Sequence, residues 1–348
     1  MIPILLSTLI LNIFSFFNLL GIDKGLVITQ LTFFIISILA FFIFKKIGLQ
    51  NIKKNINAIY WLFIILFLLL FIFGERIRGS TRWFDLYFFN FQPSEFFKIS
   101  LILFFSKFFV TTDFDIEKKS YFFKSLFYIF IPFILVYFEP DFGNAISYIF
   151  IFFIMILFSS IPKKYLFYSI LIGLLFLPIS WNFMKDYQKQ RIISFIKPEI
   201  NQLTSGYNSS QAIITIGSGK FLGRGLGYGT QSKLNFLPES HTDFAFASLI
   251  EQFGFFGGFI ILILYFILIY SLIQKTLFFY NNKTIDNHYY FYYLLGLTSY
   301  LIFQISINIG MNLGILPITG ISLPFISYGG SSLVTLFIGI SILPTDKV

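Results

Sequence analysis

The chain has 348 residues, of which 57% are hydrophobic and only 12% are charged, and its formal net charge is +9. The apolar share, about 198 residues, suffices for roughly ten membrane-spanning helices of about 20 residues each, which excludes a soluble enzyme with a single apolar anchor. A transmembrane β-barrel is disfavoured because the apolar runs are continuous rather than alternating. In a membrane protein the positive charge reflects lysines in cytoplasmic loops, so no nucleic-acid partner is expected. The absence of cysteine excludes disulfide and thiolate chemistry.

Ten apolar runs separated by polar residues predict an all-α polytopic membrane protein, built as a single domain over residues 1–348. In chain order the predicted spans are 2–20, 26–44, 58–73, 95–110, 125–138, 142–158, 165–183, 243–273, 290–312 and 326–343. The first run lacks a basic leader and a small-residue cleavage site, so we expect a retained helix rather than a signal peptide.

Lysine placement predicts the orientation of these spans. One alternate set of short loops carries Lys45, Lys46, Lys53, Lys54, Lys107, Lys118, Lys119, Lys124, Lys163, Lys164, Lys275, Lys283 and Lys347. The positive-inside rule places this set, and with it both termini, in the cytoplasm. The opposite short loops carry only Lys24, Arg76, Arg78 and Arg82. Residues 184–242, between the seventh and eighth spans, then form a long extracytoplasmic loop, whose apolar residues favour short interfacial helices over a disordered connector.

Two polar motifs lie where predicted spans begin on the outer side. In Gln92-Pro-Ser-Glu95-Phe-Phe-Lys98, Glu95 and Lys98 are spaced to share one helix face. A structural interpretation is helix capping plus a local ion pair, but a lysine one turn into a span needs a partner or a wet cavity. In Glu139-Pro-Asp-Phe-Gly143, Asp141 is either an N-cap or the partner of Lys98 in an interhelical salt bridge that shapes a polar cavity.

A third motif, Leu237-Pro-Glu-Ser-His-Thr-Asp243, ends where the eighth span begins. Thr242 and Asp243 would cap this helix in a purely structural interpretation. In a catalytic one, a carboxylate at the outer boundary acts as general base toward a sugar hydroxyl. Glu251 lies two turns deeper near the same face, and His241 is a possible assistant, although a lone histidine at a helix start is more often structural.

The arginines and the glycines carry two further indications. All five arginines, Arg76, Arg78, Arg82, Arg191 and Arg224, fall on the predicted outer side, which is compatible with an anionic lipid phosphate ligand there. The glycine-rich stretch 217–229 matches neither the phosphate-loop spacing nor the dinucleotide fingerprint, so no nucleotide site is supported. Prolines and glycines at 314–332 predict irregular backbone between the last two spans, of the kind that lines a protein cavity.

Taken together, these motifs resemble one known family. They are Arg82-Trp83, Gln92-Pro-Ser-Glu95 with Lys98, Pro140-Asp141-Phe-Gly143, Asp186-Tyr-Gln-Lys-Gln-Arg191, Gly229-Thr-Gln231, Leu237 to Asp243, Leu316-Pro317 and Ser327-Tyr-Gly-Gly330. Their order over nearly the whole chain resembles the SEDS family (shape, elongation, division, sporulation), and the Asp186 to Arg191 segment favours its RodA elongation branch over its FtsW division branch.

The resemblance implies a ten-helix peptidoglycan glycosyltransferase. It would polymerise lipid II on the outer face of the bacterial cytoplasmic membrane, together with a class B penicillin-binding transpeptidase. The essential aspartate of the family maps to Asp243. The substrate-cavity positions map to Arg82, Glu95, Lys98 and Asp141, the last two as a salt bridge, and Glu239, His241, Arg191 and Arg224 are further cavity candidates. Three positions depart from the family pattern: Glu139 replaces a common Gln, Tyr87 a Gly, and Gln252 a second Glu.

The leading hypothesis is inverting glycosyl transfer with Asp243 as the general base. A polyprenyl pyrophosphate would leave, its charge offset by arginines or by a divalent cation, Mg²⁺ or Mn²⁺, and no tightly bound cofactor is expected. The main alternative is a lipid II flippase, for which charge should be spread over both membrane halves. The inner halves of the spans carry almost none, which favours the enzyme. A third hypothesis, a purely structural scaffold, would not explain why polar residues occur at Asp243 and Lys98.

Overall fold

The computed structural model describes residues 1–77, 80–85, 90–113, 118–183, 186–196, 205–281 and 284–344, and about four fifths of them are helical. The helices are α1 (Ile2–Ile22), α2 (Lys24–Phe73), α3 (Pro93–Asp113), α4 (Lys118–Phe138), α5 (Phe142–Leu157), α6 (Lys163–Phe183), α7 (Asp186–Ile196), α8 (Ser205–Ser218), α9 (Thr230–Lys233), α10 (Ala245–Asn281), α11 (Ile285–Asn312) and α12 (Gly330–Ser341). The strands are β1 (Glu75–Ile77), β2 (Ser80–Asp85) and β3 (Asn90–Phe91).

The all-helical polytopic class is confirmed. Among the described residues, five helices are long and apolar enough to cross a membrane, namely α1, α2, α4, α10 and α11. Each of the ten predicted spans falls on a helix, and two of them, 26–44 and 58–73, fall on the single element α2. That element is two helices joined at Gly48, whose φ of 73° and ψ of 155° interrupt the helical backbone. Glycine reaches this positive φ without the steric cost that a side chain imposes.

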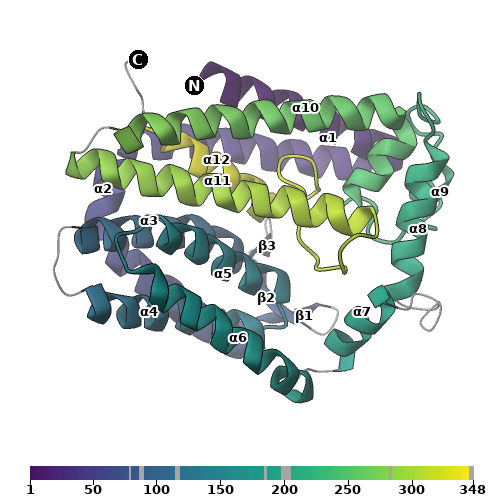
Figure 1. Cartoon of the computed structure of the whole chain (residues 1–348). Coiled ribbons are helices and arrows are strands. Elements are labelled where there is room, and N and C mark those ends of the chain that lie inside the picture. The colour runs from purple at the N-terminus through teal and green to yellow at the C-terminus, as the bar shows by residue number, and fades with distance from the viewer. Residues whose placement is uncertain are drawn as a thin grey trace.

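The long helices run side by side in one bundle (Figure 1). Helix α11 is central, since it packs against α10 on one side and against α3 and α5 on the other. Close approach depends on glycine there: a Cβ on Gly296 would lie 2.6 Å from Ile102 of α3 and 3.0 Å from Met155 of α5. Between helices in lipid, packing contacts of this kind replace the hydrophobic effect as the source of association.

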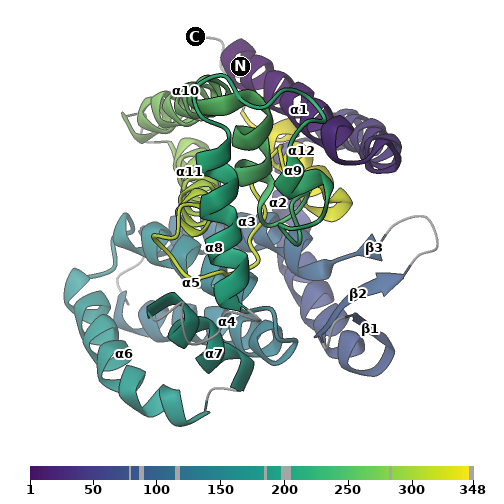
Figure 2. The ribbon, with the colours of Figure 1, turned by 90° about the vertical axis from the view of Figure 1, so that its right-hand side faces the viewer.

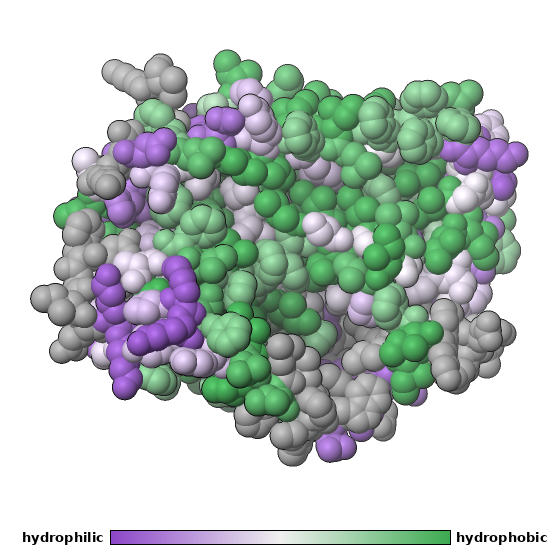
Figure 3. Space-filling view, viewed as in Figure 1, coloured by the Kyte–Doolittle hydropathy of each residue, from purple (hydrophilic) through white to green (hydrophobic). Residues whose placement is uncertain are grey.

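Aromatic side chains fill the core and also cover its outer surface. Tyr60 of α2 stacks on Phe104 of α3 at 4.3 Å between ring centroids, and both rings contact Tyr128 of α4. Other aromatic residues face outward, as Phe42 and Phe266 do with 62% and 68% of their surface exposed. Hydrophobic residues form a broad zone across the middle of the molecule, and hydrophilic residues gather toward its two ends (Figure 3). This distribution is the one expected of a protein surrounded by lipid.

The two ends of the bundle differ. At one end, here called the lysine end, Lys53 forms an ion pair with Asp286 at 2.9 Å, and Lys275 donates to the carbonyl of Pro344. At the other, the Asp243 end, lie α7, α8, α9 and the strands (Figures 1 and 2). Three of the elements at this end, α7, α8 and α9, belong to residues 184–242, which were predicted to contain short helices. The side of the membrane that each end faces stays a prediction.

The strands were not predicted from the sequence. They form a three-stranded antiparallel sheet in the order β1-β2-β3, with Glu75 opposite Trp83 and Phe84 opposite Phe91. Strands of two to six residues are too short to show a distinct alternation between two apolar runs. Their consequence for the site is that Arg82 lies on β2, the middle strand of the connection between helix α2 and helix α3.

Candidate functional site

Asp243 lies in the turn that precedes helix α10. The turn is closed by the backbone N–H groups of Thr242 and Phe244, which both donate to the carbonyl of Glu239 at 3.1 Å. The Thr242 hydroxyl donates to Glu239 Oε2 at 3.0 Å. One N–H of the first turn of α10 is capped from another helix, because Asn312 Oδ1 of α11 accepts the Ala247 N–H at 3.0 Å. The structure therefore gives Thr242 a contact within the turn instead of a capping contact with the helix.

Two asparagines hold the main chain of Asp243. Asn308 Nδ2 donates to the Asp243 carbonyl at 3.0 Å, and Asn312 Nδ2 donates to the same oxygen at 3.1 Å. Both side chains are fully buried, and their four-residue spacing places them on one face of α11. Sequence reasoning missed them, although two asparagines four residues apart in an apolar span are the signal that would have found them. Their bonds fix where the Asp243 backbone lies relative to the bundle.

The loop between α11 and α12 covers this turn. The N–H of Tyr328 donates to the His241 carbonyl at 2.8 Å, and the Ser327 hydroxyl donates to the Thr242 carbonyl at 2.7 Å. At Gly320, whose φ is 77°, an added Cβ would lie 3.7 Å from Asp243 Oδ2. The structure thus brings together two motifs separated by about 80 residues of sequence, and it sets the carboxylate of Asp243 against a glycine backbone.

A second polar cluster surrounds Asp141, in the turn between α4 and α5. Its Oδ2 accepts hydrogen bonds from Asn144 at 2.8 Å, Ser94 at 2.9 Å and Gln92 at 3.1 Å, and its Oδ1 lies 3.7 Å from Arg82 Nη1. Burial alone raises the pKa of this carboxyl, but the Arg82 charge and the hydrogen bonds from Asn144 and Ser94 outweigh it and hold the pKa below its usual value. Asp141 is therefore an ionised structural centre that orients Arg82.

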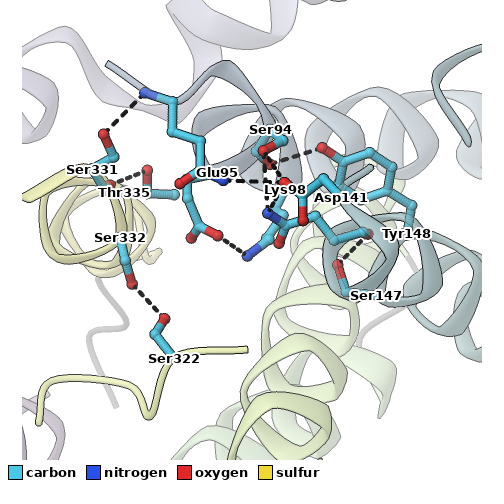
Figure 4. A network of polar contacts seen from close by, with 12 residues as sticks. Ser94, Glu95, Lys98, Asp141, Ser147, Tyr148, Ser322, Ser331, Ser332 and Thr335 are labelled. Carbon is cyan, nitrogen blue, oxygen red and sulfur yellow. Dashed lines mark hydrogen bonds and ion pairs between the residues drawn. The ribbon is translucent and has the colours of Figure 1, made fainter. Parts of the chain in front are cut away.

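The predicted salt bridge between Lys98 and Asp141 is not formed. Lys98 Nζ instead donates to Glu95 Oε1 at 2.7 Å, one turn away on α3 (Figure 4). The same Nζ lies 5.1 Å from the centre of the Tyr300 ring. The i,i+3 spacing allows this local pair without any movement of α5, and Asp141 already has other donors. Both partners are buried, Lys98 fully and Glu95 with 7% of its surface exposed. Lys98 and Glu95 thus form the local ion pair of the structural interpretation.

Several buried polar atoms in this cluster have no hydrogen-bond partner within the described part of the chain. They are Arg82 Nε, Glu95 Oε2 and both carboxyl oxygens of Glu139. Glu139 is fully buried, and burial, followed by the nearby Asp141 charge, raises its pKa to about 9 against a smaller opposing effect of Arg82. Glu139 is therefore uncharged at neutral pH, while Arg82 and Glu95 retain capacity for a polar ligand.

Three consecutive loop residues connect the two clusters. A Cβ on Gly143, two residues after Asp141, would lie 2.9 Å from the carbonyl oxygen of Thr319 and 2.8 Å from the Ile321 side chain. The residue between these two, Gly320, lies against the Asp243 carboxylate. Since neighbouring Cα atoms are 3.8 Å apart, the proposed base and the Arg82–Asp141 cluster flank one short stretch of backbone. The start of α12 lies nearby: Ser331 accepts from the N–H of Gln92, just before α3, and Ser332 is hydrogen-bonded to Ser322 of the loop (Figure 4).

The remaining predicted residues lie elsewhere or outside the description. Glu251 is fully buried and accepts hydrogen bonds from the N–H groups of Gln231 and Ser232 and from the Ser232 hydroxyl, so it anchors α9. Arg224 is exposed, and its Nε donates to the Ser218 carbonyl at 3.3 Å. Arg78 and Tyr87 lie outside the described residues, as do the side chains of Arg76 and Arg191.

No group of three or more His, Cys, Asp or Glu side chains that could hold a metal ion occurs within the described residues. A divalent cation at this site would thus need most of its ligands from the substrate or from water. The residues themselves offer a backbone-anchored carboxylate, Asp243, and an oriented guanidinium, Arg82, whose clusters flank the same stretch of backbone at residues 319–321. That combination suits proton removal from a hydroxyl beside a bound phosphate group.

Comparisons with known proteins identify the family of the chain. A profile of the FtsW, RodA and SpoVE family, described as cell cycle proteins, matches residues 4–345. The chain is 33% identical over 344 residues to the peptidoglycan glycosyltransferase MrdB of Escherichia coli K12, covering 99% of this chain and 91% of that one. It is 35% identical over 315 residues to the probable peptidoglycan glycosyltransferase FtsW of Wigglesworthia glossinidia brevipalpis, covering 90% and 81%.

Solved structures share the fold. One comes from work on the structural coordination of polymerization and crosslinking by a peptidoglycan synthase complex. It superimposes with a TM-score of 0.81 at 24% identity, covering 98% of this chain and 95% of that one. The rod shape determining protein RodA of Thermus thermophilus superimposes with a TM-score of 0.72 at 24% identity, covering 98% and 94%.

Proposed function

The chain belongs to the FtsW, RodA and SpoVE family of cell cycle proteins, and on that premise we propose that it polymerises lipid II with Asp243 as general base. It is a multi-pass membrane protein and a peptidoglycan glycosyltransferase, as its relatives are named. The observation that carries the catalytic proposal is the Asp243 turn, in which two buried asparagines hold the backbone and the carboxylate lies beside Gly320.

The chemical step is a glycosyl transfer with inversion. Asp243 removes the proton from the acceptor sugar hydroxyl as that oxygen forms a bond to the anomeric carbon of the donor. The bond from this carbon to the pyrophosphate oxygen breaks, and the electron pair leaves with the lipid pyrophosphate. Because pyrophosphate is a good leaving group, no nucleotide is needed. The proton passes from Asp243 to water before the next cycle.

Arg82 is the residue best placed to bind the charged leaving group. Asp141 and the Pro140 carbonyl orient its guanidinium, while Nε remains unpartnered and buried. A guanidinium held in this way can donate two hydrogen bonds to phosphate oxygens as their charge develops. Lys98 contributes less net charge, because Glu95 neutralises it at 2.7 Å. A divalent cation, Mg²⁺ or Mn²⁺, would enter with the pyrophosphate and offset part of its charge.

We further propose that the Asp243 end faces the outside of the cytoplasmic membrane and that a class B penicillin-binding transpeptidase is the partner. The lysines of the opposite loops support the orientation through the positive-inside rule. The partner is supported by the fold shared with a protein from a synthase complex that combines polymerization with crosslinking. The alternative of a lipid II flippase is not favoured, since the curated relatives are named glycosyltransferases.

The test is polymerisation of labelled lipid II by the purified protein in lipid nanodiscs, with and without the transpeptidase. Asp243→Asn keeps the shape of the side chain but removes the base, so glycan formation should fall by about 10² or more. Asp286→Asn at the lysine end is the matched control and should polymerise normally. Undiminished glycan chains from the Asp243→Asn protein would overturn the assignment of the base. Lipid II transport without polymer from the unchanged protein would favour the flippase.

A further inference from the structure

Helix α10 is broken at Gly254, and a loop fills the break. Gly254 has φ 69° and ψ −169°, so the backbone groups around it cannot all bond within the helix. The loop supplies partners on both sides: the Arg224 and Gly225 N–H groups donate to the carbonyls of residues 251 and 252, and the N–H groups of residues 255 and 256 donate to the carbonyls of Lys220 and Phe221. These four bonds, of 2.8 to 3.2 Å, fix the loop at the height of the break.

The loop cannot slide away from this position without losing close backbone contact. A Cβ on Gly223 would lie 2.1 Å from the Gln252 carbonyl oxygen and 2.6 Å from the Gly254 nitrogen. Further along the same loop, the N–H groups of Gln231 and Ser232 donate to the Glu251 carboxylate. Both ends of the segment 220–233 are thus attached to α10 around its break.

The length of α10 places the break at a membrane boundary. The 21 residues 254–274, which end directly before Lys275, carry no charge and span about 32 Å of helix. The hydrocarbon layer is about 30 Å thick. With Lys275 at the lysine end, bonded to the Pro344 carbonyl, Gly254 lies at the opposite edge of that layer. Residues 220–225, which are bonded to the break, must lie at the same depth.

Apolar side chains of this loop are exposed and continue the lipid-facing surface of α10. Phe221 and Leu222 have 69% and 80% of their surface exposed, and Tyr228 has 77%. The Phe221 ring lies 5.9 Å from that of Phe255 and 6.4 Å from that of Phe256, centroid to centroid, and these two α10 residues are themselves more than half exposed. The loop therefore extends an apolar surface that already faces lipid.

The charges of the loop match a phospholipid headgroup layer. Lys220, Arg224 and Lys233 are exposed, and residues 217–238 contain no Asp or Glu. The nearest acid along α10, Glu251, is buried and occupied by the hydrogen bonds described above. Apolar side chains flanked by cations at one depth are the pattern of segments that lie in an anionic membrane interface.

We propose that residues 220–228 are an interfacial membrane anchor, with Phe221 and Leu222 inserted into the lipid layer at the Asp243 end and Lys220 and Arg224 at its phosphates. The occupant of this surface is the bilayer leaflet itself, including its anionic glycerophospholipids. The anchor holds the break of α10 at the membrane interface. It thereby also positions the short first part of α10, which begins directly after the Asp243 turn. The proposal does not depend on the identity of the catalytic base.

Insertion is tested by fluorescence of a single tryptophan. Leu222→Trp is made in a chain whose own tryptophans, Trp61, Trp83 and Trp181, are replaced by phenylalanine, and the protein is placed in nanodiscs without any partner. Lipids brominated near the headgroup end of the acyl chain should quench the emission strongly, and lipids brominated near the chain terminus weakly. Phe266→Trp in the middle of α10 should show the reverse order. Ser210→Trp, exposed on α8, serves as the comparison for a polar site.

The outcomes are distinct. Emission of Leu222→Trp that neither brominated lipid quenches would overturn the anchor and would indicate a surface open to water or to a partner protein. Because Leu222 is 80% exposed, its replacement removes few contacts and the variant should fold, which gel filtration and polymerising activity can verify. The role of Lys220 and Arg224 is tested with an anionic lipid. Quenching of the Leu222→Trp emission should increase when phosphatidylglycerol is added to phosphatidylcholine, and the double change Lys220→Gln with Arg224→Gln should abolish that increase. Equal quenching in both lipid mixtures would overturn the role of the two cations.

Discussion

Replacing Glu139 by glutamine should make the protein more stable, and increasingly so as the pH rises. Glu139 is fully buried, neither of its carboxyl oxygens has a hydrogen-bond partner in the described structure, and its pKa is raised to about 9 by burial and by Asp141. In the unfolded chain the same carboxyl ionises near its ordinary value of 4.5. Glutamine has the same shape and no proton to lose. It is also the residue that the family pattern led us to expect at this position.

The sign and the size follow from proton linkage. Between about pH 4.5 and 9 the folded protein keeps a proton on Glu139 that the unfolded chain has released, so folding is favoured at low pH and loses stability as the pH rises. The loss is about 1.36 kcal/mol per pH unit in this window. From pH 6 to pH 8 the Glu139→Gln protein should therefore gain about 2.7 kcal/mol relative to the parent chain, since two pH units are crossed.

The assay is thermal or denaturant unfolding of both proteins in the same detergent at pH 6, 7 and 8. The free energies of unfolding should diverge steadily across this series. Asp286→Asn, which changes an exposed carboxylate to an amide at the lysine end, is the control and should differ from the parent by the same amount at each pH. Parallel pH dependence of the parent and the Glu139→Gln protein would refute the reasoning, because it would mean that Glu139 carries no displaced proton.

Three further substitutions test other contacts. Lys98→Met alone should cost about 3–5 kcal/mol of unfolding free energy, because it leaves the Glu95 carboxylate buried without its cation. The double change with Glu95→Gln should recover most of that loss, and equal midpoints for the single and double variants would contradict the pairing. Asn308→Leu should lower kcat for lipid II polymerisation by about 10² with little change in KM, because it releases the backbone of the proposed base. An unchanged kcat would show that this anchor is dispensable. Gly223→Ala should free the loop on α10 and expose it to limited proteolysis, whereas Gly217→Ala, where a Cβ meets nothing within 4 Å, should not. Equal cleavage of the two alanine proteins would argue against the close contact.

The sequence identified some of the site because polar residues are conspicuous in an apolar chain. A charge in or near a membrane span is energetically costly unless it has a partner or a function. The residues that meet this description are Arg82, Glu95, Lys98, Asp141 and Asp243. Which of them pair could not be read from spacing. Lys98 had two candidate partners at compatible positions, and the structure gives it Glu95, since Asp141 is already surrounded by donors from three other side chains and by Arg82.

Other parts of the site left weak signals in the sequence. Asn308 and Asn312 are uncharged, and an amide in a span costs little enough to pass as ordinary packing, so their hold on Asp243 was missed. The strand that carries Arg82 was missed because six residues are too few for a period of two to emerge. From the sequence, Glu251 is a second acid within the membrane, near the helix face of Asp243. Its carboxylate instead anchors α9, which depends on a contact with residues about 20 positions earlier in the chain.

The amino-acid sequence by itself determined that the chain is helical, membrane-embedded and a member of its family. The length of an apolar run and the order of motifs can be read along the chain without knowledge of the tertiary structure. The sequence also determined which carboxylate stands at the start of the eighth span. Only the tertiary structure decided that the turn around Asp243, the loop at Gly320 and the Arg82–Asp141 cluster come together. The physical reason is that these segments are joined by packing between helices and by hydrogen bonds over 65 to 85 residues of sequence, and contacts at such separation leave no periodicity along the chain.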